Sequence, residues 1–266
     1  MLFSSGNINI QQKKIISIVG TRKVTSYGTA FCEELLADLA PLDPVIVSGF
    51  AYGVDICAHK AAMANGLQTI GCLAHGLNQI YPKTHKKYVA EVEANGGFYT
   101  DYWSTDPFDR KNFLGRNRII AGLSEATIVI ESAHKGGSLV TAEIAHSYHR
   151  DVFAVPGRAT DPYSKGCNTL IKTQKAHLLT SAADLLYILN WELNETSKPV
   201  VQKQLFVELD TEEQKIYNFL HTNGKELLDI IALRCEVPTF QVASTLLGME
   251  LKGVVRPLPG KLFEAV

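Results

Sequence analysis

The chain has 266 residues, of which 46 % are hydrophobic and 20 % are charged, and this composition excludes a disordered or low-complexity protein. Its 26 Lys and Arg nearly balance 27 Asp and Glu, so a histone-like polycation is excluded and any affinity for nucleic acid must come from a local basic patch. No apolar run approaches the ~18 residues of a membrane span, no signal-peptide core opens the chain, and the five cysteines never form C-x-x-C. We therefore expect a soluble, cytoplasmic protein with reduced thiols, without a membrane partner or a metal site.

Short β-branched apolar runs alternate with helical patterns over most of the chain, as in a parallel sheet covered on both faces. Strands are predicted at residues 15–20, 45–49, 68–74, 126–132, 151–157 and 177–181, with a weaker candidate at 97–101. Helices are predicted near residues 26–39, 54–65, 85–95, 139–149 and 182–189. The alternation predicts an α/β domain, Rossmann-like and doubly wound around a mostly parallel sheet.

The texture of the sequence changes after Trp191. Residues 194–205 are polar, contain Pro199 and follow neither period, which is typical of a linker. Three helical patterns follow, and residues 254–263 indicate a small hairpin around Pro259 and Gly260. We therefore predict a Rossmann-like domain at 1–193, a linker at 194–205 and a winged-helix-like domain at 206–266.

Glycine-rich loops follow several of the predicted strands, at residues 20–28, 48–55, 135–141 and 156–166. In an open parallel sheet, ligands bind beyond the carboxyl ends of the strands, where backbone amides and helix N-termini suit phosphates. Any one of these loops also fits an ordinary tight turn without a ligand. Neither a P-loop nor a G-x-G-x-x-G motif occurs, so we expect a phosphate-rich ligand and no bound cofactor.

Basic and aromatic residues are interleaved in these loops. The basic ones are Arg22, Lys23, Lys83, Lys86, Lys87, Arg110, Lys111, Arg116, Arg118, Lys135, Arg158 and Lys165, and the aromatic ones are Phe50, Tyr52, Tyr81, Phe113 and Tyr163. Cations neutralise a phosphate chain while aromatic faces stack unpaired bases, which favours single-stranded nucleic acid. A solvated rim with packed tyrosines is an equally good interpretation of the charges alone.

Several polar clusters allow two interpretations each. Arg116 and Arg118 precede an apolar helical stretch, where they would grip phosphates or where one would pair with Asp101 or Glu125. Asp55 and His59 are four residues apart and would share one helix face. They suggest either an acid–base or metal-binding pair or a structural role, and we favour the structural role. His146 and His149 are three residues apart on a predicted helix, and we favour a structural role for them as well.

Six motifs in order give the chain a resemblance to a known family. They are I-V-G-T-R-x-x-x-x-Y-G from Ile18, S-G-x-A-Y-G-V-D-x-x-A-H from Ser48, G-L-x-x-x-Y-P-K from Gly76, R-N-R-I-I-A-G-L-S from Arg116, G-S-L-V-T-A from Gly137 and V-F-A-V-P-G from Val152. On these residues the chain resembles the DprA (Smf) family of DNA-processing proteins over nearly its whole length. The resemblance starts after that family's N-terminal helical domain, which we expect to be absent here.

The resemblance implies a non-enzymatic, homodimeric protein of competence and natural transformation. Such a protein binds single-stranded DNA, displaces single-strand-binding protein and loads the RecA recombinase for homologous recombination. It further implies that Arg22 and Lys83 make the main phosphate contacts, in a pocket lined by Gly20, Thr21, Ser48, Gly49, Gly53, Arg116, Arg118, Gly136, Gly137 and Ser138. The chain departs from the family's pattern at Gly136, which replaces a customary Ser, and in the segments N-F-L-G before Arg116 and Thr100-Asp101.

Two rival functions stay open. G-G-S-L-V-T-A-E (residues 136–143) is similar to the loop of nucleoside-monophosphate phosphoribohydrolases, in which Glu143 would be catalytic. A winged-helix regulator with a sensor domain is the other rival. The segment 206–266 has nine acidic against six basic residues, a net charge of −3, and residues 239–251 contain neither Lys nor Arg, so we predict a protein-interaction module there. Candidate dimer contacts are Ile171 and Leu178.

Overall fold

The protein is described by a computed structural model that covers residues 1–11, 13–191, 209–258 and 260–265. The chain divides into two compact units, Met1–Asn194 and Glu195–Val266, and each has its own hydrophobic core. The predicted linker at 194–205 lies outside the described residues, and the domain boundaries remain a prediction.

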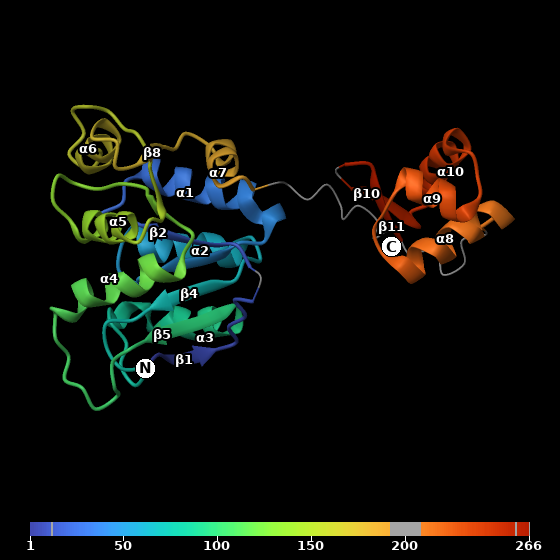
Figure 1. The fold of residues 1–266 in the computed structure, drawn as a ribbon. Helices are drawn as coiled ribbons and strands as arrows, with labels where there is room; N and C mark the ends of the chain where they lie inside the picture. The colour runs from blue at the N-terminus through green and yellow to red at the C-terminus, as the bar shows by residue number, and fades with distance from the viewer. Residues whose placement is uncertain (12, 192–208, 259, 266) are drawn as a thin grey trace. The chain divides into compact units, whose positions relative to one another are not determined.

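The first unit is built on an eight-stranded sheet (Figure 1). Its strand order is β1 (Phe3–Gly6), β5 (Gly96–Thr100), β4 (Thr69–Cys72), β3 (Val45–Ser48), β2 (Ile15–Val19), β6 (Ala126–Val129), β7 (Asp151–Ala154) and β8 (His177–Leu178). All neighbours are parallel except the edge strand β1, which is antiparallel to β5. The predicted α/β fold with a mostly parallel sheet is therefore confirmed.

The sheet is wound in two directions from its middle. From β2 the chain adds β3, β4 and β5 on one side, then crosses back to place β6, β7 and β8 on the other. The neighbours β2 and β6 therefore form the topological switch point, where the connections leave the sheet in opposite directions. The carboxyl ends of β2, β3 and β6 lie at one edge, which is where a ligand site is expected.

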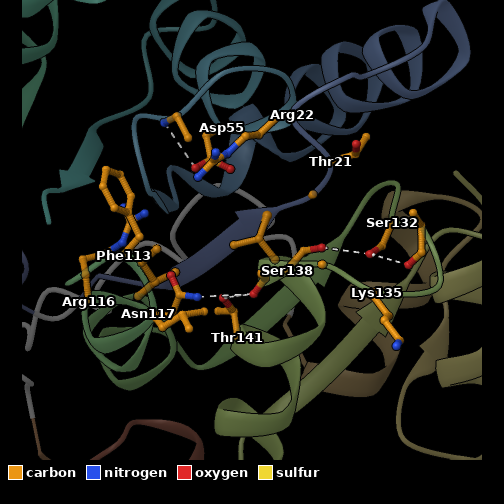
Figure 2. A pocket seen from close by; sticks show the side chains of 18 of the residues that line it. Thr21, Arg22, Asp55, Phe113, Arg116, Asn117, Ser132, Lys135, Ser138 and Thr141 are labelled. Atoms are coloured by element: carbon orange, nitrogen blue, oxygen red, sulfur yellow. Dashed lines mark hydrogen bonds between the residues drawn. The ribbon is translucent and has the colours of Figure 1, made fainter. Parts of the chain in front are cut away.

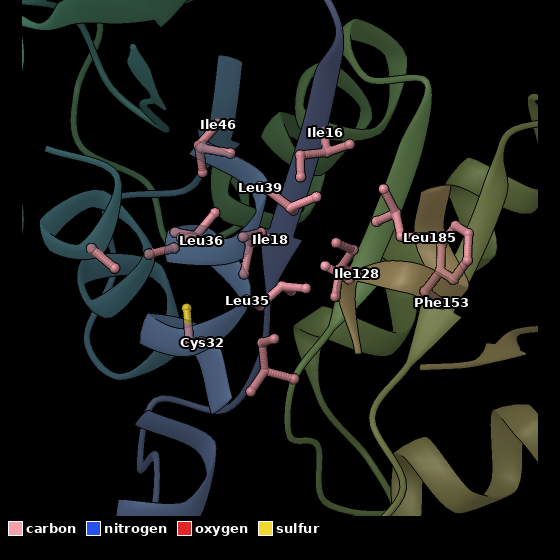
Figure 3. Packing of buried hydrophobic residues seen from close by; sticks show 14 of the residues in the cluster. Ile16, Ile18, Cys32, Leu35, Leu36, Leu39, Ile46, Ile128, Phe153 and Leu185 are labelled. Carbon is pink, nitrogen blue, oxygen red and sulfur yellow. The ribbon is translucent and has the colours of Figure 1, made fainter. Parts of the chain in front are cut away.

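Helices cover both faces of the sheet. One face packs against α1 (Ser26–Leu39), α2 (Val54–Ala64) and α7 (Ala182–Leu189), and the other against α4 (Asn112–Leu123), α5 (Gly137–Ser147) and α6 (Lys165–Lys172). A smaller cluster joins the short α3 (Val89–Ala94) to β5. Successive strand residues point to opposite faces, so Ile16 and Ile18 of β2 pack in one cluster with Leu36 and Leu39 of α1 (Figure 3), while Val19 faces the opposite core. Each such fully buried side chain stabilises the fold by about 1.5–3 kcal/mol.

Some local predictions were wrong. The helix expected at 85–95 is a 3₁₀ segment, η2 (Lys83–Tyr88), followed by α3. The helix α4 begins at Asn112, so Arg116 and Arg118 lie inside it and not at its start. Its first turn has no side-chain cap, which removes the usual start signal from the sequence. The strand β1 was missed because its sequence, F-S-S-G, lacks apolar alternation and is held by pairing with β5.

The second unit contains the predicted helices and hairpin. Its described elements are α8 (Thr211–Asn223), β9 (Glu226–Leu227), α9 (Leu228–Cys235), α10 (Thr239–Leu251), β10 (Val255–Leu258) and β11 (Leu262–Ala265), with a β10-β11-β9 sheet. A capping box starts α8, since Asp210 accepts a hydrogen bond from Glu213 N at 2.8 Å and Glu213 accepts one from Asp210 N at 2.9 Å. The winged-helix outline is confirmed.

No single helix among the described residues has the length and apolar character to cross a membrane. Among the described helices, only α9 and α10 taken together have the required length and apolar character, and the pair is bent by 108° at the break between them.

Candidate functional site

A cavity of about 370 Å³ opens beyond the carboxyl ends of β2 and β6, at the switch point of the sheet (Figure 2). Three connections and the helix α4 build its walls. The lining residues are Val19, Gly20, Thr21, Arg22, Ala51, Asp55, Arg110, Phe113, Leu114, Arg116, Asn117, Ile120, Ser132, Ala133, Lys135, Gly136, Gly137, Ser138 and Thr141.

The loop after β2 is fixed by a buried carboxylate from the neighbouring connection. Glu131, which is 2 % exposed, accepts hydrogen bonds from Thr25 N at 2.8 Å and Thr25 Oγ1 at 2.5 Å. Its backbone oxygen accepts a third from Thr21 N at 2.7 Å, and Thr25 itself caps α1 through Gly28 N at 3.2 Å. These bonds hold both ends of the short segment that carries Arg22.

The loop after β3 packs backbone to backbone against the loop after β2. Val54 N, in the first turn of α2, donates to Thr21 O at 3.1 Å. Gly53 precedes it with φ +78°, and a Cβ there would collide with Thr21 O. Only glycine combines this left-handed conformation with so close an approach, which explains its place in the loop.

Arg22 is an exposed cation of the cavity, as are Arg110 and Lys135. Among the described residues no carboxylate lies within ion-pairing distance of Arg22, and its guanidinium carbon is 5.9 Å from the centre of the Phe113 ring. Figure 2 shows it beside Asp55, across the cavity from Ser138 and Thr141. The charge of Arg22 is therefore open to an anionic ligand.

Arg116 has a different environment, since it is only 4 % exposed. Its Nη1 donates to Gly49 O at 2.6 Å and to Cys72 O at 2.5 Å, while its buried Nε has no partner among the described residues. Burial lowers the pKa of Arg116 and raises the pKa of Asp55, whose carboxylate accepts a hydrogen bond from Ala51 N at 3.3 Å. Arg116 and Asp55 therefore place opposite charges in the wall of the cavity, so Arg116 adds little net positive charge for a ligand.

The third wall is the N-terminus of α5, an eleven-residue helix preceded by Gly136. Its unpaired backbone amides favour negative charge near Gly137 and Ser138. Ser132 Oγ and Ser138 Oγ are 2.9 Å apart, and Asn117 Nδ2 donates to Gly137 O at 3.3 Å, which ties α4 to α5. Lys135 extends from the same loop (Figure 2). The arrangement suits a phosphate or another oxyanion.

The structure brings most of the predicted site residues together. Seven of them line the cavity, namely Gly20, Thr21, Arg22, Arg116, Gly136, Gly137 and Ser138. Gly49 and Gly53 do not line it but leave room for Arg116 and for the loop after β2. Ser48 is fully buried, and its Oγ donates to Ile18 O at 2.6 Å, so it links β3 to β2.

Two predicted basic residues lie apart from the cavity. Lys83 is exposed at the start of η2 and does not line it. Arg118 pairs with Asp101 and lines a separate cavity with Met1 and Leu2. A spacing of two on a helix turns Arg118 about 200° away from Arg116, which is why the two arginines face different surfaces.

An aromatic cluster adjoins the cavity. The ring of Tyr81 is 5.4 Å from Phe113 and 5.1 Å from Phe108, and the latter two rings are 5.9 Å apart. Tyr81 is 40 % exposed and Phe108 is 42 % exposed. Phe50, predicted with the other loop aromatics to offer a face for unpaired bases, is fully buried against Phe98 and does not offer one.

The residues considered for catalysis do not converge. Glu143 is an exposed residue of α5 that pairs with Lys175 at 3.7 Å and does not line the cavity. His59 bonds through Nδ1 to Thr69 Oγ1 at 2.7 Å in the core, away from the Asp55 hydrogen bond. No group of three or more potential metal ligands occurs among the described residues.

Sequence reasoning missed three site residues: Glu131, Asn117 and Ser132. Two of them end the run A-T-I-V-I-E-S, where an acid after a buried strand was the available signal for Glu131. Asn117 lies between the two arginines of the R-N-R motif, and only the observed start of α4 shows that it faces α5.

Comparison with known proteins identifies relatives for both units. The family model for DNA recombination-mediator protein A matches residues 1–190, and the DprA winged helix domain model matches residues 203–261. Protein Smf of Escherichia coli (strain K12) is 34 % identical over 264 residues, which is 97 % of this chain and 70 % of that protein. The DNA processing protein DprA of Streptococcus pneumoniae (strain ATCC BAA-255 / R6) is 38 % identical over 186 residues, covering 70 % of this chain and 65 % of that one.

Solved structures of DprA proteins agree with the family found by sequence. Streptococcus pneumoniae DprA matches with a TM-score of 0.66 at 38 % identity, over 70 % of this chain and 65 % of that one. Helicobacter pylori DprA, whose structure is described by its single-stranded DNA binding mode, matches with a TM-score of 0.65 at 30 % identity. The match covers 71 % of this chain and 86 % of that one. The chain spans 63 % to 70 % of the length of the curated relatives that match most of it. Family models matching both units, together with these relatives, show that the chain belongs to the DNA recombination-mediator protein A (DprA) family.

Proposed function

We propose that this protein binds the backbone of single-stranded DNA in the cavity at the switch point. The observation that carries the proposal is the unpaired Arg22 held across the cavity from the N-terminus of α5. Two positive features thus face one enclosed space, and a phosphodiester placed between them gains hydrogen bonds and charge neutralisation together. The single-stranded DNA named for the Helicobacter pylori relative agrees with this ligand.

The surroundings of the cavity favour an unpaired strand over a duplex. The exposed rings of Tyr81 and Phe108 offer faces on which bases stack without sequence preference, and such faces are useful only when bases are unpaired. Lys83 follows Tyr81 directly in the chain and is exposed. We therefore assign Lys83 to the phosphate next to the one in the cavity.

The cellular role proposed here follows from family membership. The protein is a non-enzymatic recombination mediator that works as a homodimer in the cytoplasm. It receives incoming single strands in natural transformation, displaces single-strand-binding protein and loads RecA. The position of Glu143 outside the cavity supports a binding role over the phosphoribohydrolase alternative, which needs that carboxylate beside the ligand.

The test is a salt-dependent titration of a fluorescent oligonucleotide of roughly 30 nucleotides, single-stranded and duplex, with wild type and Arg22→Ala. We expect tighter binding of the single strand. The variant should bind all sequences more weakly and should lower the slope of log affinity against log salt by about one phosphate contact.

The matched control is Lys60→Ala, which removes one exposed positive charge from α2 outside the cavity. An equal loss of affinity in both variants would assign the effect to net charge and contradict the site. Unchanged affinity in Arg22→Ala would remove the cavity from DNA binding altogether.

A further inference from the structure

The helix α10 of the second unit exposes a line of large apolar side chains. Phe240 is 79 % exposed, Leu247 is 59 % exposed and Leu251 is 85 % exposed. At 100° per residue, positions 240, 247 and 251 fall within about 40° of one another. We call these three residues the α10 stripe. The helix meets its own core through Val242, Leu246 and Met249, which lie on the opposite side.

The stripe is not explained by packing among the described residues of the second unit. None of its three residues belongs to the hydrophobic core formed by α8, α9, α10 and β10. The positions between them are small, Ala243, Ser244 and Gly248, and a Cβ added at Gly248 would meet no atom within 4 Å. Single exposed apolar residues are ordinary, but three in line on one helix face mark an interaction surface.

The charges near the stripe decide what kind of molecule covers it. The helix α10 contains neither Lys nor Arg, so it lacks the cations that a DNA groove or an anionic membrane surface would require. From Leu228 to Lys252 the charged residues are Asp229, Arg234, Glu236, Glu250 and Lys252, all exposed, and Lys252 is paired with Glu213. None of the three acids forms an ion pair with another described residue.

We propose that the α10 stripe binds an amphipathic helix of a partner protein whose apolar side chains are flanked by Lys or Arg. The apolar line supplies buried area, while the small residues between Phe240 and Leu251 admit the partner's side chains. The exposed, unpaired acids of α9, of α10 and of the turn between them attract basic flanks. A second copy of the chain is disfavoured as the occupant because it would bring the same acids together.

The experiment uses the full chain and synthetic fluorescent peptides of about 18 residues, long enough to match α10 when helical. One peptide places Leu on one face and Lys on the other. A second replaces Lys with Glu, and a third has the Leu and Lys composition without an apolar face. The proteins are wild type, the double variant Phe240→Ser/Leu247→Ser, and Tyr187→Ser, which removes an 87 % exposed aromatic residue from the first unit.

We expect wild type and Tyr187→Ser to bind the one-sided Leu and Lys peptide alike, and the double variant to bind it at least tenfold more weakly. The other two peptides should bind more weakly than the first. Equal binding by the double variant, equal binding of the Glu peptide, or no binding of the first peptide up to about 1 mM would each overturn the proposal. A sedimentation shift from dimer to monomer in the double variant alone would show that the stripe binds a second copy of the chain instead.

Discussion

At the scale of single residues, the cavity depends on Gly49, which has no side chain beyond hydrogen. The carbonyl of Gly49 accepts the hydrogen bond from Arg116, and the position where a Cβ would stand is filled by Arg116 Nη1 and lies 2.5 Å from Asp55 Oδ2. A methyl group there requires the buried guanidinium to move. Because Arg116 is surrounded by main chain on two strands, little room is available for that movement.

We therefore expect Gly49→Ala to lower the free energy of unfolding by about 1–3 kcal/mol and to weaken single-strand binding. The control is Gly122→Ala in α4, where the new methyl group would meet only the Tyr148 ring at 3.7 Å. Helix propensity predicts that this control is neutral or stabilises by up to about 1 kcal/mol. Urea unfolding measures both, and equal stability of Gly49→Ala and wild type would show that the Arg116 environment is adaptable.

A second residue-scale prediction concerns His59. It is fully buried, and burial lowers its pKa to about 3, whereas an unfolded chain has a histidine pKa near 6.5. Between these values only the unfolded state binds the proton, so the stability contributed by this group falls as the pH decreases from about 6.5 towards 3. The slope for one group reaches about 1.4 kcal/mol per pH unit.

The measurement is urea unfolding of wild type and His59→Gln at pH 7 and pH 5. Wild type should lose more stability than the variant between the two conditions, whatever their difference at pH 7. Parallel losses would mean that His59 does not titrate on unfolding as its burial implies.

At the scale of elements, the sequence predicts what is local and misses what is supplied by neighbours. The buried strands were predictable because their apolar β-branched runs are short and end at glycine or serine. The strand β1 and the start of α4 were not, because pairing with β5 and packing against α5 replace any local signal. The site divides in the same way. The loop of Arg22 was evident from its glycine turn, but the outward direction of Arg118 depends on the phase of α4.

The composition of α10 yields a prediction about the second unit. In a winged helix the equivalent helix enters the major groove, and that requires cations to neutralise phosphates. Since residues 239–251 have none, the fragment 206–266 should not bind duplex DNA in the micromolar range at physiological salt. A mobility-shift titration measures this directly, with the full chain and single-stranded DNA as the positive control. Micromolar duplex binding by the fragment would restore a DNA-reading role.

At the scale of the whole molecule, homodimer formation is a prediction that the exposed Leu178 makes testable, whereas Ile171 is partly buried against the core. Leu178 in β8 is 47 % exposed, and Ile171 lies in the preceding helix α6. Among the described strands, β8 is the last one at its edge of the sheet, and a second chain could pair with such an edge.

We expect Leu178→Glu to shift wild-type dimers to monomers in sedimentation velocity while leaving the thermal unfolding midpoint within a few degrees. Each monomer should retain its cavity but bind a long oligonucleotide more weakly, because two linked sites on one strand reinforce each other. The exposed Tyr187→Glu is the matched control. A variant that remains dimeric would move the interface elsewhere.

The carboxylate of Glu131 joins the two windings of the sheet, because it follows β6 yet holds the loop that follows β2. The two sides of the cavity cannot separate at this edge without leaving a buried carboxylate unsatisfied, which opposes opening. These hydrogen bonds therefore hold the mouth of the site together without a ligand. The conformational entropy of the Arg22 loop is lost during folding and not during DNA binding. The site is therefore preorganised for a single strand.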